Sequence, residues 1–344
     1  MKQRYLEFDY LRGIAILLII LGHAVVNIDR TFPLALNNLI AGGSGVFVFV
    51  SGFFFHRVFA PRFDYRAFMA KKIRNVFLPF LLVSLVALLP MMWIWLGKPG
   101  MTPEKFAENL YWQLNDGYVL YPHWYIPFIM AVFLLSPVYL LYVRASTAAQ
   151  LLLLAEACIA AMLVHRPLGN INVLQSLVYF TPYYLAGILC SQHYGVLARH
   201  RRVIAATALL GVSLFVVLQT LAFPHLANYH KAPLQFAGID LMFWQKLCLC
   251  LVLLEFARWL SVHAPSPLLL EISRASFALY FLHPFLLSAV HDPMMPWLRS
   301  LHPGALTNIA ATGVSLLLAT ALTYAVALAV RRSFGQRSRM LIGW

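Results

Sequence analysis

The sequence predicts an all-α, polytopic membrane protein with about ten transmembrane helices and both termini in the cytoplasm. Hydrophobic residues make up 61% of the chain and charged residues only 11%, which lies far outside the range of soluble domains. Ten apolar runs have a length that crosses a bilayer. The basic residues between these runs also follow the asymmetry that orients helices in a membrane.

The span count is supported by the distribution of the basic residues. We place the ten spans at 11–27, 39–57, 76–96, 124–143, 148–164, 174–192, 203–222, 239–260, 274–291 and 305–330. Nineteen of the 26 Lys and Arg then lie in inner segments, and seven lie in outer loops: Arg30, Lys98, Lys105, Arg166, Lys231, Lys246 and Arg299. Because this pattern obeys the positive-inside rule, the basic excess is topological, and we expect no nucleic-acid partner.

The first span carries an arginine at its foot and a histidine eleven residues later. With a helical rise of about 1.5 Å and a turn of about 100° per residue, Arg12 and His23 lie about 16 Å apart along the axis on one face. A histidine inside a span is costly unless it is paired or used, so a functional role is the default and a satisfied structural histidine the alternative. Asp9 lies three residues before Arg12 and can orient it through an ion pair.

The second span, 39–57, combines small residues with a basic end. Its glycines and serines, Ser51 among them, permit close approach either to a neighbouring helix or to a ligand. Six basic residues fall within the eighteen positions from Arg57 to Arg74: Arg57, Arg62, Arg66, Lys71, Lys72 and Arg74. This exceeds what topology requires, and two ligands fit it equally: anionic lipid heads or a polyanionic nucleotide.

The next spans carry scattered polar groups. The outer loop 97–123 after the third span contains carboxylates and aromatics, which suit carbohydrate contact but also occur in interfacial belts. His123 and Trp124 open the fourth span. Glu156 is an ionisable group among Leu and Ala of the fifth span and needs a partner or a proton. Its role, structural or functional, is open.

The ninth span, 274–291, places polar residues on one helical face. Ser276, Tyr280 and His283 follow the i, i+4, i+7 spacing, and His283 is a second histidine within a span. Pro182 in the sixth span and Pro284 in the ninth predict bends. The four cysteines all lie inside apolar runs: Cys158, Cys190, Cys248 and Cys250. We therefore expect neither a disulfide nor a metal site.

Together these motifs resemble the acyltransferase-3 superfamily of membrane acyltransferases. The resemblance is carried in the family's order by Arg12 and His23, the Ser51–Phe54 run ending near Arg57, the Lys71–Arg74 cluster before Pro79, His123-Trp124-Tyr125, and Ser276–His283. It implies a ten-helix fold in a bacterial inner membrane. It also implies transfer of acetyl or other short acyl groups from cytoplasmic coenzyme A thioesters to envelope glycans. Tyr10, near the foot of the first helix, is bulkier than the small residue that members of this family often have at that position.

The resemblance also implies roles for individual residues. Acyl-CoA is the expected donor substrate, held by Arg12, Arg57, Lys72, Arg74 and Ser51, with no permanently bound cofactor. His23 is the expected catalytic residue, supported by Arg12 and Asp9. It acts either as general base on a sugar hydroxyl or as carrier of the acyl group. The expected substrate-binding residues are His123, Trp124, Tyr280, His283 and Glu156.

The chain resembles the branch without an appended esterase-like domain, so we expect one domain over residues 1–344. Its expected partners are acyl-CoA, a glycan acceptor, membrane lipid and polysaccharide synthesis or export machinery. Other functions stay open at this stage: a transporter of polysaccharide or lipid-linked glycan, or a non-catalytic subunit of a polysaccharide synthase. A proton-coupled transporter needs acidic residues in several spans and an internal repeat. The sequence has only Glu156 and no repeat.

Overall fold

The structure is a computed structural model that describes residues 5–224, 230–235 and 238–344. Lys2 and Arg4, which enter the charge count, lie outside this part. The described chain is almost entirely helical, as the composition predicts. Two short strands, β1 (Arg166–Pro167) and β2 (His230–Lys231), pair in parallel.

The helices follow one another with short connections. The first half contains α1 (Leu6–Ala24), η1 (Ile28–Arg30), α2 (Leu34–Ile40), α3 (Ser44–Phe54), the π-helical η2 (Phe55–Phe59), η3 (Ala60–Arg62), α4 (Tyr65–Lys72), the π-helical η4 (Ile73–Phe77), α5 (Leu78–Leu96), α6 (Pro103–Asn115), α7 (Tyr125–Leu134), α8 (Ser136–Arg144) and α9 (Thr147–Val164). The second half contains η5 (Leu168–Asn170), α10 (Val173–Gln192), α11 (Tyr194–Arg199), α12 (Arg201–Val217), η6 (Leu218–Ala222), α13 (Leu241–His263), α14 (Pro267–Arg274), α15 (Ser276–Ser300), α16 (Ala305–Phe334), η7 (Gly335–Arg337) and α17 (Ser338–Leu341).

Within the described residues, six helical stretches are long and apolar enough to cross a membrane: Leu34–Arg62, Tyr65–Leu96, Thr147–Val164, Val173–Gln192, Arg201–Ala222 and Ala305–Leu341. The pair α7 and α8, bent by 57°, makes a seventh if it is counted as one span. The remaining three predicted spans coincide with α1, α13 and α15. These helices carry more charged or polar groups, such as Glu7, Asp9 and Arg12 in α1. The total of ten and the side of the termini stay predictions.

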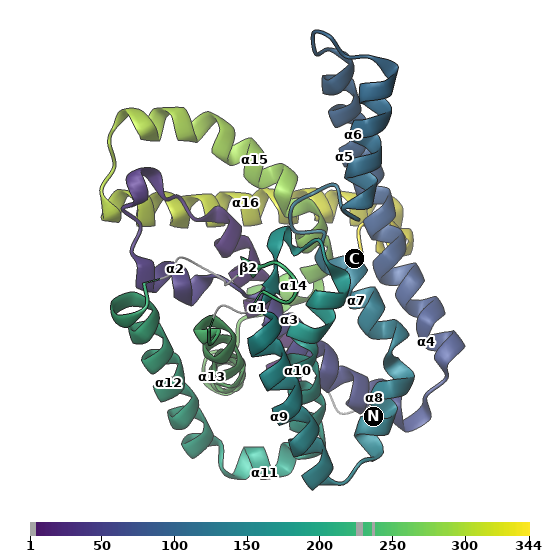
Figure 1. The fold of residues 1–344 in the computed structure, drawn as a ribbon, viewed down its shortest axis with the longest axis vertical. Coiled ribbons are helices and arrows are strands. Elements are labelled where there is room, and N and C mark those ends of the chain that lie inside the picture. Colours follow the sequence, from purple (N-terminus) through teal and green to yellow (C-terminus); the bar gives the residue numbers. More distant parts are fainter. Residues whose placement is uncertain (1–4, 225–229, 236–237) are drawn as a thin grey trace.

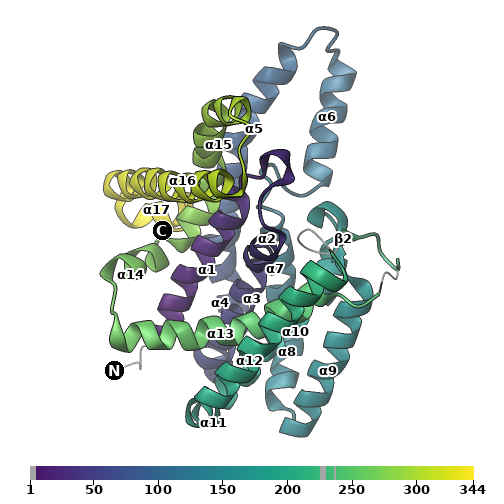
Figure 2. The same cartoon turned by 90° about the vertical axis from the view of Figure 1, so that its left-hand side faces the viewer.

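Helix α1 runs through the interior of the bundle, where it packs against α3, α13, α14, α15 and α16 (Figures 1 and 2). It begins at Leu6, earlier than the predicted 11, and ends at Ala24. Its central position explains why Phe8, Tyr10 and Ile16 are fully buried. The Tyr10 hydroxyl accepts a hydrogen bond from the Ser266 backbone N–H at 2.6 Å, which ties α1 to the start of α14.

Glycines allow α3 and α10 to pack backbone to backbone. A side-chain carbon added to Gly52 would collide with the Tyr184 carbonyl, and one added to Gly187 would collide with the Phe49 carbonyl. Close helix approach at small residues is the usual way to join membrane helices. Of the two explanations for the small residues of the second span, helix packing therefore accounts for Gly52.

The region after the third span is partly helical rather than a plain loop. Helix α6 begins after Thr102, whose side chain accepts a hydrogen bond from the Lys105 N–H, the standard way to start a helix. With α5 it forms a hairpin that projects beyond the other helices (Figures 1 and 2).

Candidate active site

A large basic cavity lies at the foot of α1. It has a volume of about 1190 Å³ and is lined by Arg12, Ala70, Lys71, Arg74, Asn75, Arg274, Ser276, Phe277, Arg331, Gly335, Gln336, Ser338, Arg339, Met340, Gly343 and Trp344. Six of these described lining residues are Lys or Arg, and none is Asp or Glu. We call this space the basic cavity, and its charge suits a polyanion.

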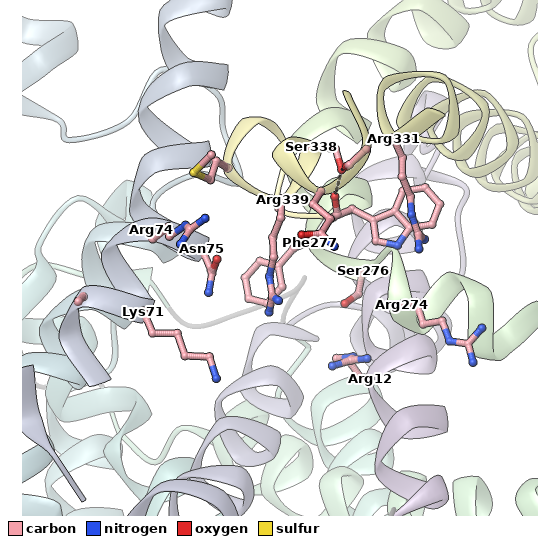
Figure 3. A pocket seen from close by; sticks show the side chains of 16 residues that line it. Arg12, Lys71, Arg74, Asn75, Arg274, Ser276, Phe277, Arg331, Ser338 and Arg339 are labelled. Atoms are coloured by element: carbon pink, nitrogen blue, oxygen red, sulfur yellow. Dashed lines mark hydrogen bonds between the residues drawn. The ribbon is translucent and has the colours of Figure 1, made fainter. Parts of the chain in front are cut away.

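Several separate elements supply the cations of the basic cavity. Figure 3 shows Arg12, Lys71 and Arg339 around the open space, and these residues come from α1, α4 and α17. The Arg12 Nε donates to Ser273 Oγ at 3.1 Å, and its Nη2 lies 3.6 Å from Asp9. The contact with Asp9 confirms the predicted Asp9–Arg12 pair. Together the two contacts hold the guanidinium at the cavity wall.

A second, smaller space adjoins the basic cavity. This aromatic pocket has a volume of about 170 Å³ and shares Arg12 and Phe277 with the basic cavity. Its other lining residues are Phe47, Val50, Ser51, Phe54, Phe55, Phe59, Phe68, Lys72, Val76, Tyr125, Ile129, Phe133 and Tyr184. The Lys72 ammonium lies 4.1 Å from the Phe133 ring centre, so cation–π contact holds it inside this pocket.

The far end of α1 carries His23 in a cluster of rings. The ring centre of His23 lies 5.6 Å from that of His283 and 4.6 Å from that of Tyr121. His283 is completely buried, whereas His23 is exposed. We call His23, His283 and Tyr121 together the imidazole cluster. It lies in neither the basic cavity nor the aromatic pocket.

Helix α15 connects the cavity to the imidazole cluster, as the predicted spacing indicates. Ser276 lines the basic cavity, Tyr280 is buried one turn further, and His283 stacks on His23. The Tyr280 hydroxyl donates to the Pro122 carbonyl, and its ring lies 5.9 Å from that of Tyr125 in the aromatic pocket. Arg12 and His23 therefore occupy different surroundings at the two ends of α1, because Arg12 lines both cavities and His23 lines neither. The expectation from their shared helical face, that the two side chains line one common passage, is wrong for these cavities.

Comparison with known families assigns the chain. Residues 5–329 match the family Acyl_transf_3, described as an acyltransferase domain. The chain belongs to the acyltransferase-3 family. Its activity is accordingly that of a membrane acyltransferase. Comparisons with curated proteins and with solved structures find no match.

Not every predicted site residue of this acyltransferase lies at these cavities. Arg57 lines neither space: it donates to the Tyr5 hydroxyl and lies over the Tyr5 ring at 4.8 Å. Glu156 is exposed on α9 and also lines neither. Lys72 and Ser51 line the aromatic pocket instead of the basic cavity. The predicted phosphate set is thus divided, and Arg12 and Arg74 alone of its members line the basic cavity.

The predicted substrate-binding residues His123 and Trp124 are both buried. His123 is fully buried, with Nε2 3.4 Å from the Phe281 carbonyl and Nδ1 3.5 Å from Ser84 Oγ. Trp124 lies under the Arg166 guanidinium at 4.9 Å. The ring centre of His123 lies 6.0 Å from that of Tyr280, whereas neither His123 nor Trp124 lines the basic cavity or the aromatic pocket.

Sequence reasoning missed several site residues of this acyltransferase. Arg274, Arg331 and Arg339 complete the basic cavity, but as ends of apolar runs they were explained by topology alone. Arg166 was counted as an outer-loop cation, yet it is buried and donates to Asn170 Oδ1 at 2.6 Å. Tyr121 was one of several aromatic residues in the outer loop 97–123, and nothing in the sequence distinguished it from the others. Burial raises the pKa of its phenol above the usual range, so it stays a hydrogen-bond donor.

Proposed function

We propose that this acyltransferase moves an acyl group, most simply acetyl, from cytoplasmic acyl-CoA to a sugar hydroxyl of an envelope or exported glycan. The enzyme acts in the bacterial inner membrane, as the family resemblance implies. The observation that carries the donor assignment is the basic cavity, in which six cations face one space without a carboxylate among the described lining residues.

The charge of this cavity fits the nucleotide end of coenzyme A. That end carries several phosphates, and arginine forks bind phosphate oxygens in pairs. Arg74 of η4 and Arg339 of α17 both line the cavity (Figure 3). Arg331 stacks on Trp344 with its guanidinium 4.5 Å from the ring centre, which offers an aromatic surface beside the phosphates.

The aromatic pocket fits the rest of the donor. Coenzyme A carries its thioester at the end of a long, thin and largely uncharged arm. The pocket adjoins the basic cavity at Arg12 and Phe277, and its lining includes Tyr125, which contacts Tyr280. His283 lies one turn beyond Tyr280, against His23. An arm that follows this line brings the thioester toward the two imidazoles.

His23 is the catalytic group in this proposal. It is exposed at the end of α1, where an acceptor hydroxyl can reach it from the opposite side. Either it takes the hydroxyl proton as general base, which contributes about 10² to 10⁴ in rate, or it carries the acyl group covalently. The aromatic residue Tyr121 beside it offers a stacking face and a donor for a sugar.

An assay with purified protein tests this function. Protein in detergent or vesicles is incubated with radiolabelled acetyl-CoA and a membrane glycan extract, and transfer and free coenzyme A are measured. We expect acceptor-dependent release of coenzyme A by the wild type and none by His23→Ala. A preparation that is inert toward several acyl-CoA donors but moves glycan across vesicles would instead support transport.

A further inference from the structure

The hydrogen bonds of His283 fix its tautomer. Its Nδ1 lies 3.0 Å from the Leu279 carbonyl oxygen and 2.9 Å from the Tyr280 carbonyl oxygen. Carbonyl oxygens only accept hydrogen bonds, so Nδ1 carries the hydrogen and donates it. In the neutral ring the other nitrogen, Nε2, then has a free lone pair. Two backbone carbonyls on its own helix thus make His283 a base at Nε2.

This lone pair is buried and unused. His283 has no accessible surface, and within the described part of the chain no group makes a hydrogen bond to its Nε2. A buried acceptor without a partner costs stability, and such groups are uncommon in native proteins unless they serve a function. A bound hydroxyl that donates to Nε2 satisfies the group.

His23 lies beside His283, ring against ring. The two rings are nearly parallel, at an angle of 28°, with their centres 5.6 Å apart. The two imidazoles also differ in setting, because His283 is held by its backbone carbonyls and His23 is exposed. With a single histidine, the roles of general base and of acyl carrier cannot be told apart. Two imidazoles at this separation, in different surroundings, can take one role each.

We propose that His283 is the base that takes the proton of the acceptor hydroxyl, and that His23 is the nucleophile that carries the acyl group. This inference rests on the proposed function and assigns the two tasks within it. A nucleophile and a base within reach of one substrate are the usual arrangement for transfer in two steps.

Transfer takes place in two steps, formation of acyl-His23 and transfer of the acyl group to the acceptor. In the first, a His23 ring nitrogen bonds to the thioester carbonyl carbon and the carbon–sulfur bond breaks. The thiolate takes the proton that the other His23 nitrogen loses, so the products are acyl-His23 and coenzyme A. In the second, the acceptor oxygen bonds to the acyl carbon and the carbon–nitrogen bond breaks. The hydroxyl proton passes to His283 Nε2 and from there to His23, which restores both neutral rings.

The variant His283→Asn separates these steps. The asparagine amide can still donate to the Leu279 and Tyr280 carbonyls, but it places no acceptor at the Nε2 position. We expect rapid release of about one coenzyme A per enzyme, followed by turnover slowed about 10² to 10⁴-fold. Labelled acetyl should remain on the protein at His23 and be released by hydroxylamine, which attacks without needing a base.

A matched control is His263→Asn. His263 also has Nδ1 bonded to the carbonyl four residues earlier, at 3.0 Å from Trp259, but it is exposed at the end of α13. It should keep wild-type turnover. The double variant His23→Ala, His283→Asn should lose both the rapid release and the label.

The outcomes are distinguishable. If the wild type shows no transfer from acyl-CoA, the proposed function fails. If the wild type transfers and His283→Asn keeps full turnover, the inference is wrong. It is also wrong if folded His283→Asn, with wild-type melting temperature and coenzyme A affinity, shows slow turnover without rapid release or label. If His283→Asn does not fold, rapid-quench labelling of the wild type decides: acetyl on His23 before acceptor is added supports the inference, and its absence overturns it.

Discussion

Arg12 of α1 and Phe277 of α15 together form the boundary between the basic cavity and the aromatic pocket, since both line the two spaces. A charged group and an apolar ring at one opening match a donor that changes there from polyanion to thin arm. Arg12 thus lines both spaces, whereas His23 lies about 16 Å away along the helix.

The opening predicts a selective effect of a larger ring at position 277. In Phe277→Trp, the added ring narrows the passage, so we expect kcat for acetyl transfer to fall at least tenfold. Binding of adenosine 3′,5′-bisphosphate, which lacks the arm, should stay within twofold of the wild type. Turnover and calorimetric binding measure the two effects. Equal loss of both would place the arm elsewhere.

The basic cavity predicts which cations bind the donor. Removal of a hydrogen bond to a charged group costs about 1.5–3 kcal/mol, so Arg74→Ala should weaken coenzyme A binding about tenfold or more. Arg57→Ala, whose side chain contacts Tyr5 instead, is the matched control and should bind normally. Titration at low and high salt checks this, because the loss should shrink when salt screens the charges. Equal weakening by both variants would contradict the assignment.

Glu156 offers a test of a group placed away from the site. It is exposed on α9 and lines neither cavity, so Glu156→Gln should keep turnover and both Michaelis constants within twofold of the wild type. Steady-state assays with varied donor and acceptor measure this. A rise in the Michaelis constant for the acceptor alone would restore Glu156 as a substrate-binding residue.

The contact of α3 and α10 predicts a stability effect without a specific catalytic one. Gly187→Ala places a carbon against the Phe49 carbonyl, and overpacking of this kind costs about 1–3 kcal/mol. The melting temperature in detergent should therefore fall. Gly195→Ala, which meets no atom within 4 Å, should melt as the wild type does. An unchanged melting temperature for Gly187→Ala would mean that the two helices are not in contact.

Local helix geometry made much of this site predictable. The spacing of Arg12 and His23 and the common face of Ser276, Tyr280 and His283 depend only on the helical repeat. The structure contains the continuous helices that carry them, α1 and α15, but it does not bring Arg12 and His23 to one cavity. The Asp9–Arg12 pair is equally local, because its members are three residues apart on one helix. The positions of ten apolar runs also correspond to helices, although three of them carry polar groups.

What the sequence could not predict depends on contacts between distant segments. Arg339 joins Arg12 in one cavity although more than three hundred residues separate them, and no spacing rule reports such proximity. The division of the predicted phosphate set has the same cause. Arg57 lies in the π-helical end of the second span and contacts Tyr5, whereas the Lys72 ammonium lies over phenylalanine rings. The positive charge that Arg57 and Lys72 share gives no sign in the sequence that their surroundings differ.

The most direct test of the central claim is a structure of the protein with a non-hydrolysable acetyl-CoA analogue. We predict that the phosphates lie among Lys71, Arg74 and Arg339, that the arm passes Arg12 and Phe277, and that the carbonyl carbon lies beside His23. Phosphates bound outside the basic cavity, or an arm that leads away from His23, would contradict the account.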